Sequence, residues 1–360
     1  MNARSRILAA VGATVLVFLA VQLGALALVE PFVDAEYQVV EDPDDPTNSL
    51  LYLGIIIIAT GFILLTFRYN VEWLIRALMI VVCTVLSWYV FAVIIPIAVL
   101  VGSVDILSLG LALAVGFGLL VYPEWYVINI AGIVVGAGAA GMFGISFGLL
   151  PALLLLTVLA VYDAISVYKT KHMLSLADGV MDLKLPVIFV IPTSLSYSYL
   201  EMGSTDGVIE GAQSADGGSK ESETESESES TVETEAASKA GPDPDRAPTT
   251  DSDKPDSETD SLPERDALFI GLGDAVIPTI LVASAAFFID AGTISVPLIA
   301  LNGPALGAMI GTLAGLLVLM YMVLQGRAHA GLPLLNGGAI SGYLLGALAS
   351  GVPLLVALGL

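Results

Sequence analysis

Long apolar runs recur along this chain of 360 residues and limit what it can fold into. A helix that crosses a lipid bilayer needs about 20 predominantly apolar residues. Runs of this kind lie at 7–29, 50–67, 74–100, 104–122, 126–147, 149–168, 267–289, 297–324 and 332–350. Only 13% of the residues are charged, whereas soluble domains carry about 25%. The sequence therefore predicts an all-α polytopic membrane protein with nine transmembrane helices, six before and three after a long loop.

Two positions decide this helix count. The apolar stretch 126–168 is too long for one span. Gly148 followed by Pro151 predicts a break there, because proline is favoured in the first turn of a helix. The first run, 7–29, follows two arginines and resembles a secretory signal. Its apolar core is longer than the roughly 7–15 residues usual for a signal, so we interpret it as a membrane helix.

The positive charges predict an orientation in the membrane. Cytoplasmic segments of membrane proteins are enriched in Lys and Arg. With Arg4 and Arg6 placed in the cytoplasm, nine crossings put all 13 Lys and Arg residues on that side. We therefore expect a multi-pass protein of the cell membrane, with the N-terminus and the long loop in the cytoplasm and the C-terminus outside.

The net charge of −22 comes from two loops rather than from the membrane helices. Residues 30–49 contain seven acids and no base, and residues 201–266 contain 20 acids and five bases. The longer segment is low in complexity and has no apolar face to bury, so we expect it to be disordered. It divides the chain into an N-terminal half at 1–200, an acidic cytoplasmic linker at 201–265 and a C-terminal half at 266–360.

Two carboxyl groups lie inside otherwise apolar runs, where charge is costly and therefore indicates a function. Asp163 lies six residues before Lys169, or about 9 Å along a helix. Asp274 lies nine residues after Arg265, or about 13 Å. Both acids are therefore expected at similar depth, in the cytoplasmic half of the membrane. The alternative is that Asp163 reaches to the interface and Asp274 caps a helix that begins after Gly273.

Three short motifs resemble those of one enzyme family. Tyr162-Asp163 lies in the sixth run, Gly271-Leu272-Gly273-Asp274 lies in the seventh, and Leu332-Pro333 begins the ninth. The combination resembles the intramembrane aspartyl proteases, which are the presenilins and signal peptide peptidases, and by size and layout the archaeal presenilin homologues. The resemblance implies that Asp163 and Asp274 are the catalytic pair. It also implies substrate-binding or site-shaping roles for Tyr162, Gly271, Leu272, Gly273, Leu332 and Pro333.

The third motif departs from the family pattern. The family usually has Pro-Ala-Leu-Pro, whereas this chain has Ala330-Gly331-Leu332-Pro333. In the family this turn lies beside the catalytic pair, so the change puts the fine positioning of the site in doubt more than the mechanism. Without the other motifs, Pro333 is an ordinary helix-start proline.

The predicted function is hydrolysis of peptide bonds within transmembrane segments of other proteins. Two acids at close range share a proton, so that one activates a water and the other protonates the leaving amide. We expect no metal and no organic cofactor, since one cysteine, Cys83, and two histidines leave little for a metal site. The expected partners are transmembrane segments and the lipid bilayer, and not nucleic acid.

Two other classes of protein stay open from the sequence alone. A transporter or channel would use the same acids to relay protons or bind a cation, and an inactive membrane scaffold would use neither. The protease is favoured because a cation site usually recruits more polar groups than two acids and scattered asparagines. Asn129, Asn302 and Asn336 are interpreted as interhelical hydrogen-bond partners.

A β-branched apolar segment at 185–191 is bounded by prolines and too short to span the membrane. It predicts a short strand or a segment that lies on the membrane surface. A transmembrane substrate must be unwound before water can attack it, and its opened backbone then needs new partners. We expect residues 185–191 and 266–270 to offer strand edges to which the substrate adds, and the family resemblance points the same way.

Deletion of about residues 205–260 is expected to leave folding and cleavage of a transmembrane test peptide largely intact. A segment that forms no core contributes little to the stability of the fold. Each doubling of loop length changes the free energy of loop closure by only about 0.6 kcal/mol. The measurement is size-exclusion chromatography of the deletion variant followed by a cleavage assay. Loss of a folded, monodisperse protein would show that the segment is more than a spacer.

Overall fold

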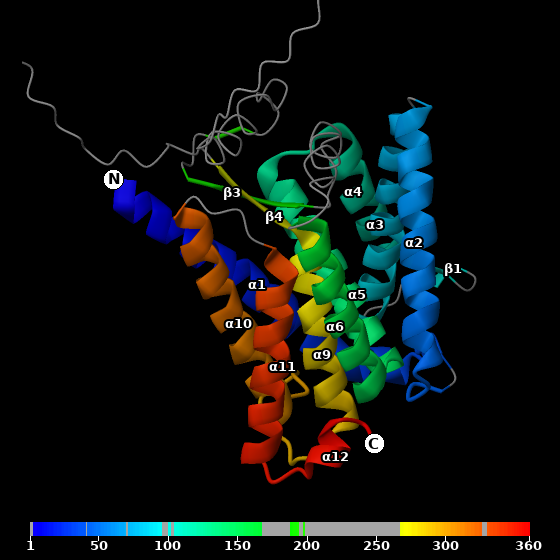
Figure 1. Ribbon diagram of the computed structural model, residues 1–360. Helices are drawn as coiled ribbons and strands as arrows, with labels where there is room; N and C mark the ends of the chain where they lie inside the picture. The colour runs from blue at the N-terminus through cyan, green and yellow to red at the C-terminus, as the bar shows by residue number, and fades with distance from the viewer. Residues whose placement is uncertain are drawn as a thin grey trace, which may run out of the picture.

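The chain is mostly helical in the computed structural model, which describes residues 3–40, 42–69, 71–95, 100–101, 104–167, 188–193, 197–198, 267–325 and 330–360 (Figure 1). The helices are α1 (Ala3–Asp34), α2 (Thr47–Arg68), α3 (Glu72–Ile94), α4 (Ile106–Val121), α5 (Trp125–Ser146), α6 (Leu149–Ile165), α9 (Leu272–Phe288), α10 (Gly303–Leu324), α11 (Gly331–Ala349) and α12 (Leu354–Ala357). Two antiparallel strand pairs accompany them: β1 (Leu100–Val101) with β2 (Val104–Asp105), and β3 (Ile188–Pro192) with β4 (Ala267–Gly271).

Each of the predicted apolar runs contains a helix. The helices α1, α3, α5, α10 and α11 are long and apolar enough to cross a membrane, which gives five such helices in the described residues. The apolar helices α2, α4, α6 and α9 are shorter over their described residues. The predicted break between α5 and α6 is confirmed, because Gly148 is the N-cap of α6 and Pro151 lies in its first turn. The chain is therefore a polytopic, mainly helical membrane protein.

The prediction of an all-α fold is wrong in detail, because three helices start later than their apolar runs predicted. Residues 104–105 form β2 ahead of α4. Residues 267–271 form β4 rather than the first turn of a helix, because their backbone pairs with β3 in the register Ile188 to Gly271; this agrees with the strand edge expected at 266–270. Residues 297–302 form part of a loop that is closed by the bridge between Thr293 and Asn302. Helix α10 starts only after that loop, since the Asn302 side chain caps it by accepting from the Ala305 N–H at 2.9 Å.

Two predictions fall outside the described residues. These are the disorder of the acidic linker 201–265 and the first part, 185–187, of the strand-like segment. The remainder of that segment forms β3 as expected.

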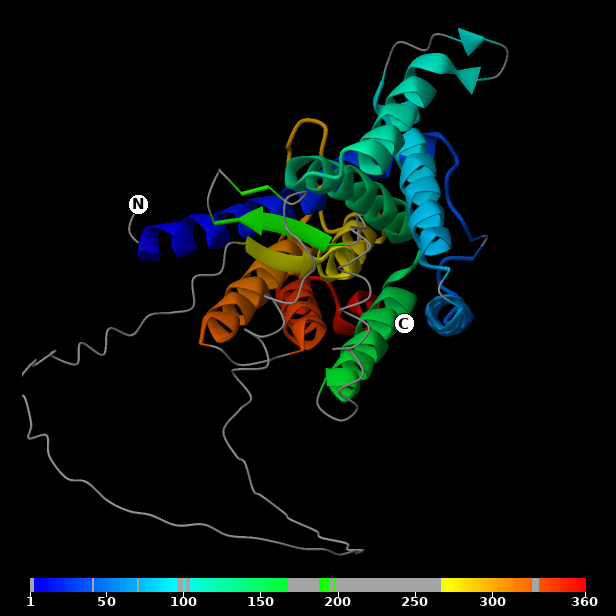
Figure 2. The same ribbon diagram turned by 90° about the horizontal axis from the view of Figure 1, so that it is seen from above.

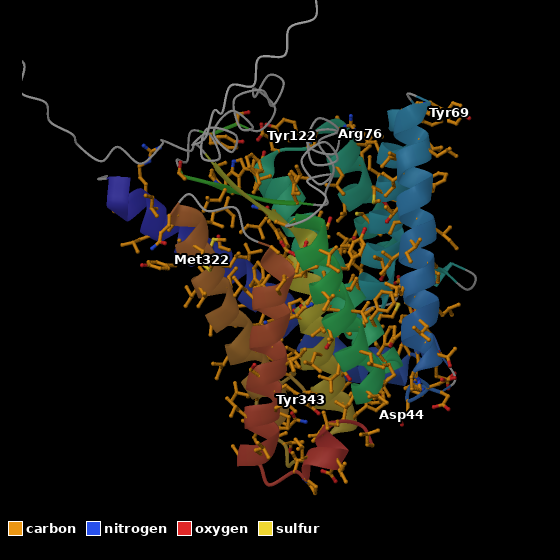
Figure 3. All side chains as sticks on the ribbon, in the orientation of Figure 1. Asp44, Tyr69, Arg76, Tyr122, Met322 and Tyr343 are labelled. Atoms are coloured by element: carbon orange, nitrogen blue, oxygen red, sulfur yellow. The ribbon has the colours of Figure 1, made fainter. Side chains whose placement is uncertain are left out.

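The helix bundle has two distinct ends. Figure 3 shows Tyr69, Arg76 and Tyr122 at one end of the bundle and Asp44 at the other. The β3–β4 sheet lies at the end that holds Arg76, and Figure 2 shows it lying across that end beside α1. Both the end of α6 and the start of α9 approach this side, so the two predicted acids share it.

Helix α9 is the centre of the fold. It contacts α1, α5, α6, α10 and α11, and a continuous stretch from Pro278 to Ala285 is buried. Small side chains permit this crowding: a Cβ at Gly144 of α5 would overlap Ala283 of α9. The helix that carries Asp274 is thus fixed on several sides by packing.

Helices α10 and α11 pack through two facing stripes of glycine. A Cβ added to Gly311 would run into the backbone of Gly338, and one added to Gly342 would run into the backbone of Gly307. Small residues spaced four apart let two membrane helices approach at backbone distance, where dispersion and Cα–H contacts hold them. The full stripes are Gly303, Gly307, Gly311 and Gly315 on α10 with Gly338, Gly342 and Gly346 on α11.

Replacement of Gly311 by alanine is expected to destabilise the protein by about 1–3 kcal/mol, because the added methyl group forces the two backbones apart. The matched control is Gly61→Ala on α2, where a Cβ meets nothing within 4 Å. Because alanine favours helix over glycine by about 1 kcal/mol, this control should not lower stability. The measurement is thermal unfolding in detergent. Equal melting temperatures for Gly311→Ala and the wild-type protein would contradict the packing argument.

Candidate active site

Asp163 lies near the end of α6 and points into the protein. Its side chain is only 7% exposed, and one carboxylate oxygen accepts a hydrogen bond of 3.1 Å from the backbone N–H of Leu332. Leu332 is the second residue of α11, whose N-cap, Ala330, provides no side-chain acceptor. Because the first N–H groups of a helix have no partner within it, the Asp163 carboxylate replaces the missing cap. The alternative, in which the Asp163 side chain reaches out to the membrane interface, is wrong, because the side chain is buried and bonded to α11.

Asp274 lies in the first turn of α9, directly after β4. The N-cap of this helix is Gly271, and the Asp274 carboxyl group lies beside it, since a Cβ at Gly271 would be 3.3 Å from an Asp274 carboxylate oxygen. An acid at the third helical position, close to the N-cap residue, occupies the position of the acid in a capping box. The expected alternative, a helix that begins after Gly273, is therefore wrong in position, because α9 already begins at Leu272.

The start of α11 brings the two acids together. Leu332 donates to Asp163, and its neighbour Gly331 lies against Asp274, since a Cβ at Gly331 would be 3.5 Å from an Asp274 carboxylate oxygen. Both carboxyl groups also lie at helix N-termini, where the helix dipole favours negative charge. The site is thus one place at which α6, α9 and α11 meet.

The other residues predicted for the site differ in what they contact. Leu332 and Pro333 form the first turn of α11 beside the acids. Gly271 touches Asp274, whereas Gly273 is exposed and a Cβ there would meet only Ile277, at 3.8 Å.

Two of the predicted residues turn away from the acids. Leu272 packs into the core near Gly136 of α5. Tyr162 is 54% exposed on α6. The structure thus places Gly271 and Leu332 against the pair, puts Pro333 in the same turn as Leu332, and assigns Leu272 to packing.

Gly331 is a site residue that the sequence analysis treated only as a mismatch. Its contact with Asp274 is ordinary van der Waals distance, so the alanine of the family pattern would also fit there. Ala330 has φ of −65°, which is the value that proline imposes. The altered motif therefore keeps a backbone that the family sequence could adopt. Only the likeness of Ala330-Gly331-Leu332-Pro333 to the family motif indicated that Gly331 lies near the aspartates, because the hydrophobic pattern of α11 does not contain this information.

Asn336 ties the same two helices together one turn deeper. It is fully buried on α11 and donates a 2.9 Å hydrogen bond to the Leu156 carbonyl of α6. This confirms the expected interhelical role of Asn336. Asn302 also links helices, because it donates to the Ala285 and Ile289 carbonyls at the end of α9. Asn129 differs, since it binds a strand rather than a helix.

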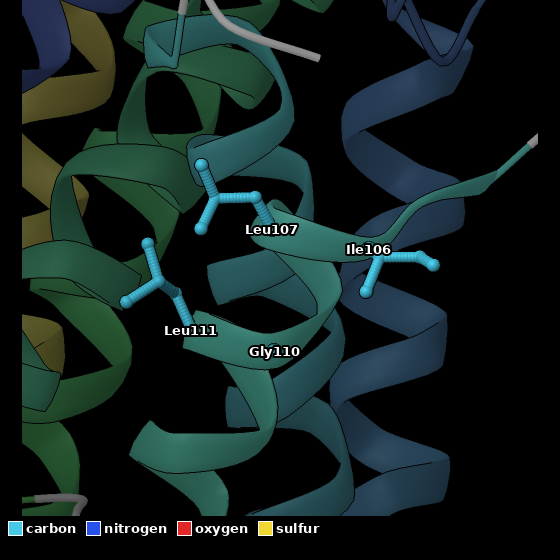
Figure 4. Close-up of a pocket in the computed structure, with 4 residues that line it drawn as sticks. All are labelled: Ile106, Leu107, Gly110 and Leu111. Carbon is cyan, nitrogen blue, oxygen red and sulfur yellow. The ribbon is translucent and has the colours of Figure 1, made fainter. Parts of the chain in front are cut away.

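Two hollows lie away from the acids. One, of about 280 Å³, is lined by Ile106, Leu107, Gly110 and Leu111 of α4 (Figure 4). It is apolar and formed by a single helix, so it offers no group for chemistry. The other, of about 340 Å³, lies between the far ends of α1 and α9 and the following loop. Among the described residues, no group of three or more His, Cys, Asp or Glu could hold a metal ion.

Comparison with known proteins identifies the family. The family described as signal-peptide peptidase, presenilin aspartyl protease matches residues 15–352. Two solved structures of a presenilin family intramembrane aspartate protease, in C222 and P2 space groups, are similar with a TM-score of 0.57 each. Their sequence identities are 30% and 31%, and the alignments cover 94% of this chain and 99% and 97% of theirs. No curated protein matches.

The chain therefore belongs to the signal-peptide peptidase and presenilin family of intramembrane aspartyl proteases. The predicted class of enzyme, a hydrolase of the aspartyl type, is confirmed. The predicted archaeal affinity stays a prediction.

Replacement of Gly331 by alanine is expected to preserve cleavage and to stabilise the protein by about 0.5–1 kcal/mol, because alanine fits and restricts the unfolded chain. Gly331→Leu should abolish cleavage, since a larger side chain must displace Asp274 or Leu319. The measurement is the cleavage rate together with the melting temperature. A folded Gly331→Ala variant without activity would contradict this description of the site.

Proposed function

We propose that this protein hydrolyses peptide bonds within transmembrane segments of other proteins and that Asp163 and Asp274 are its catalytic pair. The observation that carries the proposal is the convergence of both carboxyl groups on Gly331 and Leu332 at the start of α11. An acidic side chain inside a membrane is costly and therefore indicates a function. Two such acids, one from α6 and one from α9, meet at the first turn of α11 and provide the groups that hydrolysis needs.

The chemistry follows from one shared proton. The ionised carboxylate takes a proton from water as the water oxygen attacks the carbonyl carbon of the substrate. The protonated carboxyl group hydrogen-bonds to the developing oxyanion and then supplies the proton that the amide nitrogen needs to leave. One water is consumed, and a new carboxyl group and a new amine are released. The Leu332 N–H stabilises the ionised form of Asp163, because this N–H donates a hydrogen bond to one of the Asp163 carboxylate oxygens.

The proposal includes the membrane topology. Nine spans are supported by the nine apolar helices, including the four that are shorter over their described residues. If the end of the bundle that holds Arg76 faces the cytoplasm, the acids and the β3–β4 sheet belong to the cytoplasmic half of the membrane, and α12 lies outside. The acidic linker 201–265 then joins a six-helix half to a three-helix half on the cytoplasmic side.

The substrate is proposed to bind as an added strand. β4 runs directly into α9, so its last residue, Gly271, is three residues from Asp274. A strand paired along this sheet would lead an unwound substrate to the acids. The substrate backbone would thereby regain the hydrogen bonds that unwinding removed.

The test is cleavage of a transmembrane peptide by the full chain reconstituted in lipid vesicles. Asp163→Asn and Asp274→Asn should each lower the rate by about 10³-fold or more, because neither amide can exchange the proton. Asp290→Asn, an exposed acid beyond the far end of α9, should retain the wild-type rate. Proton and cation flux are measured in the same vesicles. Flux that depends on the two acids, without cleavage, would contradict the protease and support a transporter.

A further inference from the structure

Asn129 forms a pair of hydrogen bonds with the backbone of one strand residue. Its side-chain amide donates to the Val190 carbonyl at 2.7 Å, and its side-chain carbonyl accepts from the Val190 N–H at 2.9 Å. This is the pattern by which a neighbouring strand pairs with an extended residue. Val190 is fully buried in the middle of β3. The Asn129 side chain therefore takes the place of one residue of a strand.

The direction of these bonds assigns the two edges of the sheet. Along a strand, successive residues turn their N–H and C=O groups to opposite sides. Since Val190 faces Asn129, Phe189 and Ile191 face β4, in register with Ile270 and Leu268. The outer edge of β3 is thus covered by α5. On its other side β3 pairs with β4.

The same face of α5 holds the sheet and the catalytic helix. A Cβ at Gly132, one turn after Asn129, would lie 2.8 Å from the Phe189 ring. One at Gly136 would lie 3.2 Å from Leu272 of α9. Asn129, Gly132 and Gly136 recur at helical spacing, and so they face the same way. This face of α5 therefore sets the position of β3 relative to the start of α9, where Asp274 lies.

We propose that Asn129 is a positioning residue that locks β3 to α5, closes that edge to other strands, and thereby sets which peptide bond of a substrate reaches the aspartates. This inference rests on the proposed function, in which the substrate adds to the sheet. Without the Asn129 amide, β3 is held on α5 by packing alone, so it can shift along the helix, and the paired substrate shifts with it. The consequence is a change in the choice of the cleaved bond, beyond any change in rate.

The experiment compares Asn129→Leu and Asn129→Asp in the full chain in lipid vesicles. Leucine removes both hydrogen bonds, and aspartate keeps the size but places a second acceptor against the Val190 carbonyl. The matched control is Ile130→Leu, which introduces the same side chain at the neighbouring, 60% exposed position. Product masses from one transmembrane peptide give the cleaved bonds, and kcat and KM are measured separately. Hydrogen exchange at residues 189–191 reports on the strand itself.

We expect both Asn129 variants to cleave at additional bonds and to raise KM by about fivefold, the factor that one lost hydrogen bond carries. Exchange at Val190 should quicken in Asn129→Leu, which frees the Val190 N–H, and exchange at Phe189 and Ile191 should quicken in both variants, with no change for Ile130→Leu. Unchanged product masses and an unchanged KM would overturn the proposal, even if total activity falls. A merely structural role of Asn129 would lower only the amount of active enzyme and would alter neither the cleaved bonds nor KM. Unchanged exchange would overturn it as well. If the wild-type protein cleaves no peptide, the proposed function fails, and exchange still decides whether Asn129 holds the strand.

Discussion

The hydrogen bond from the Leu332 N–H to the Asp163 carboxylate is the interaction on which the site depends. The start of α11 lacks a side-chain cap, and a carboxylate in an apolar surrounding is unstable without donors. Each group therefore supplies what the other needs. The same turn places Gly331 against Asp274, so α11 determines the relation between both acids. Its own position follows from backbone-level packing on α10 and from the bond between Asn336 and Leu156.

The membrane imposes a second constraint, because backbone groups there must find partners within the protein. Non-helical backbone beside the acids is consequently paired: β3 bonds to β4 on one side and to Asn129 on the other. Such a sheet gives an unwound substrate a place to restore its own hydrogen bonds. In the proposed function, the support of β3 by α5 serves the presentation of an extended peptide to a water near the acids.

Some of this arrangement could be predicted from the sequence. Length and hydropathy located the helices, since few other structures satisfy a long apolar segment in lipid. The two acids stood out because charge in an apolar run is costly. The apolar pattern alone did not separate the strand at 267–271 from the helix that follows, because its residues extend the pattern of α9 without interruption; the strand edge expected there came from the needs of an unwound substrate and the family resemblance. Strand pairing there depends on β3, which is distant in sequence, and local pattern does not contain that information.

Contacts between backbones were also beyond sequence reasoning. Glycine recurs every four residues on both α10 and α11, which is a packing signal, but the spacing does not say that these two helices are partners. Asn129 was expected to bind another helix, whereas its partner is the backbone of Val190. An asparagine side chain binds helix and strand backbones with the same groups, so only the tertiary fold decides between them.

The most direct test of the account is a double-mutant cycle on Asp163 and Asp274 in the cleavage reaction. If the two acids share one proton and act as a unit, Asp163→Asn, Asp274→Asn and the double variant should all fall to the same residual rate, because the first change already removes the whole function. Independent losses that multiply in the double variant, with measurable cleavage left in either single one, would contradict a shared catalytic pair.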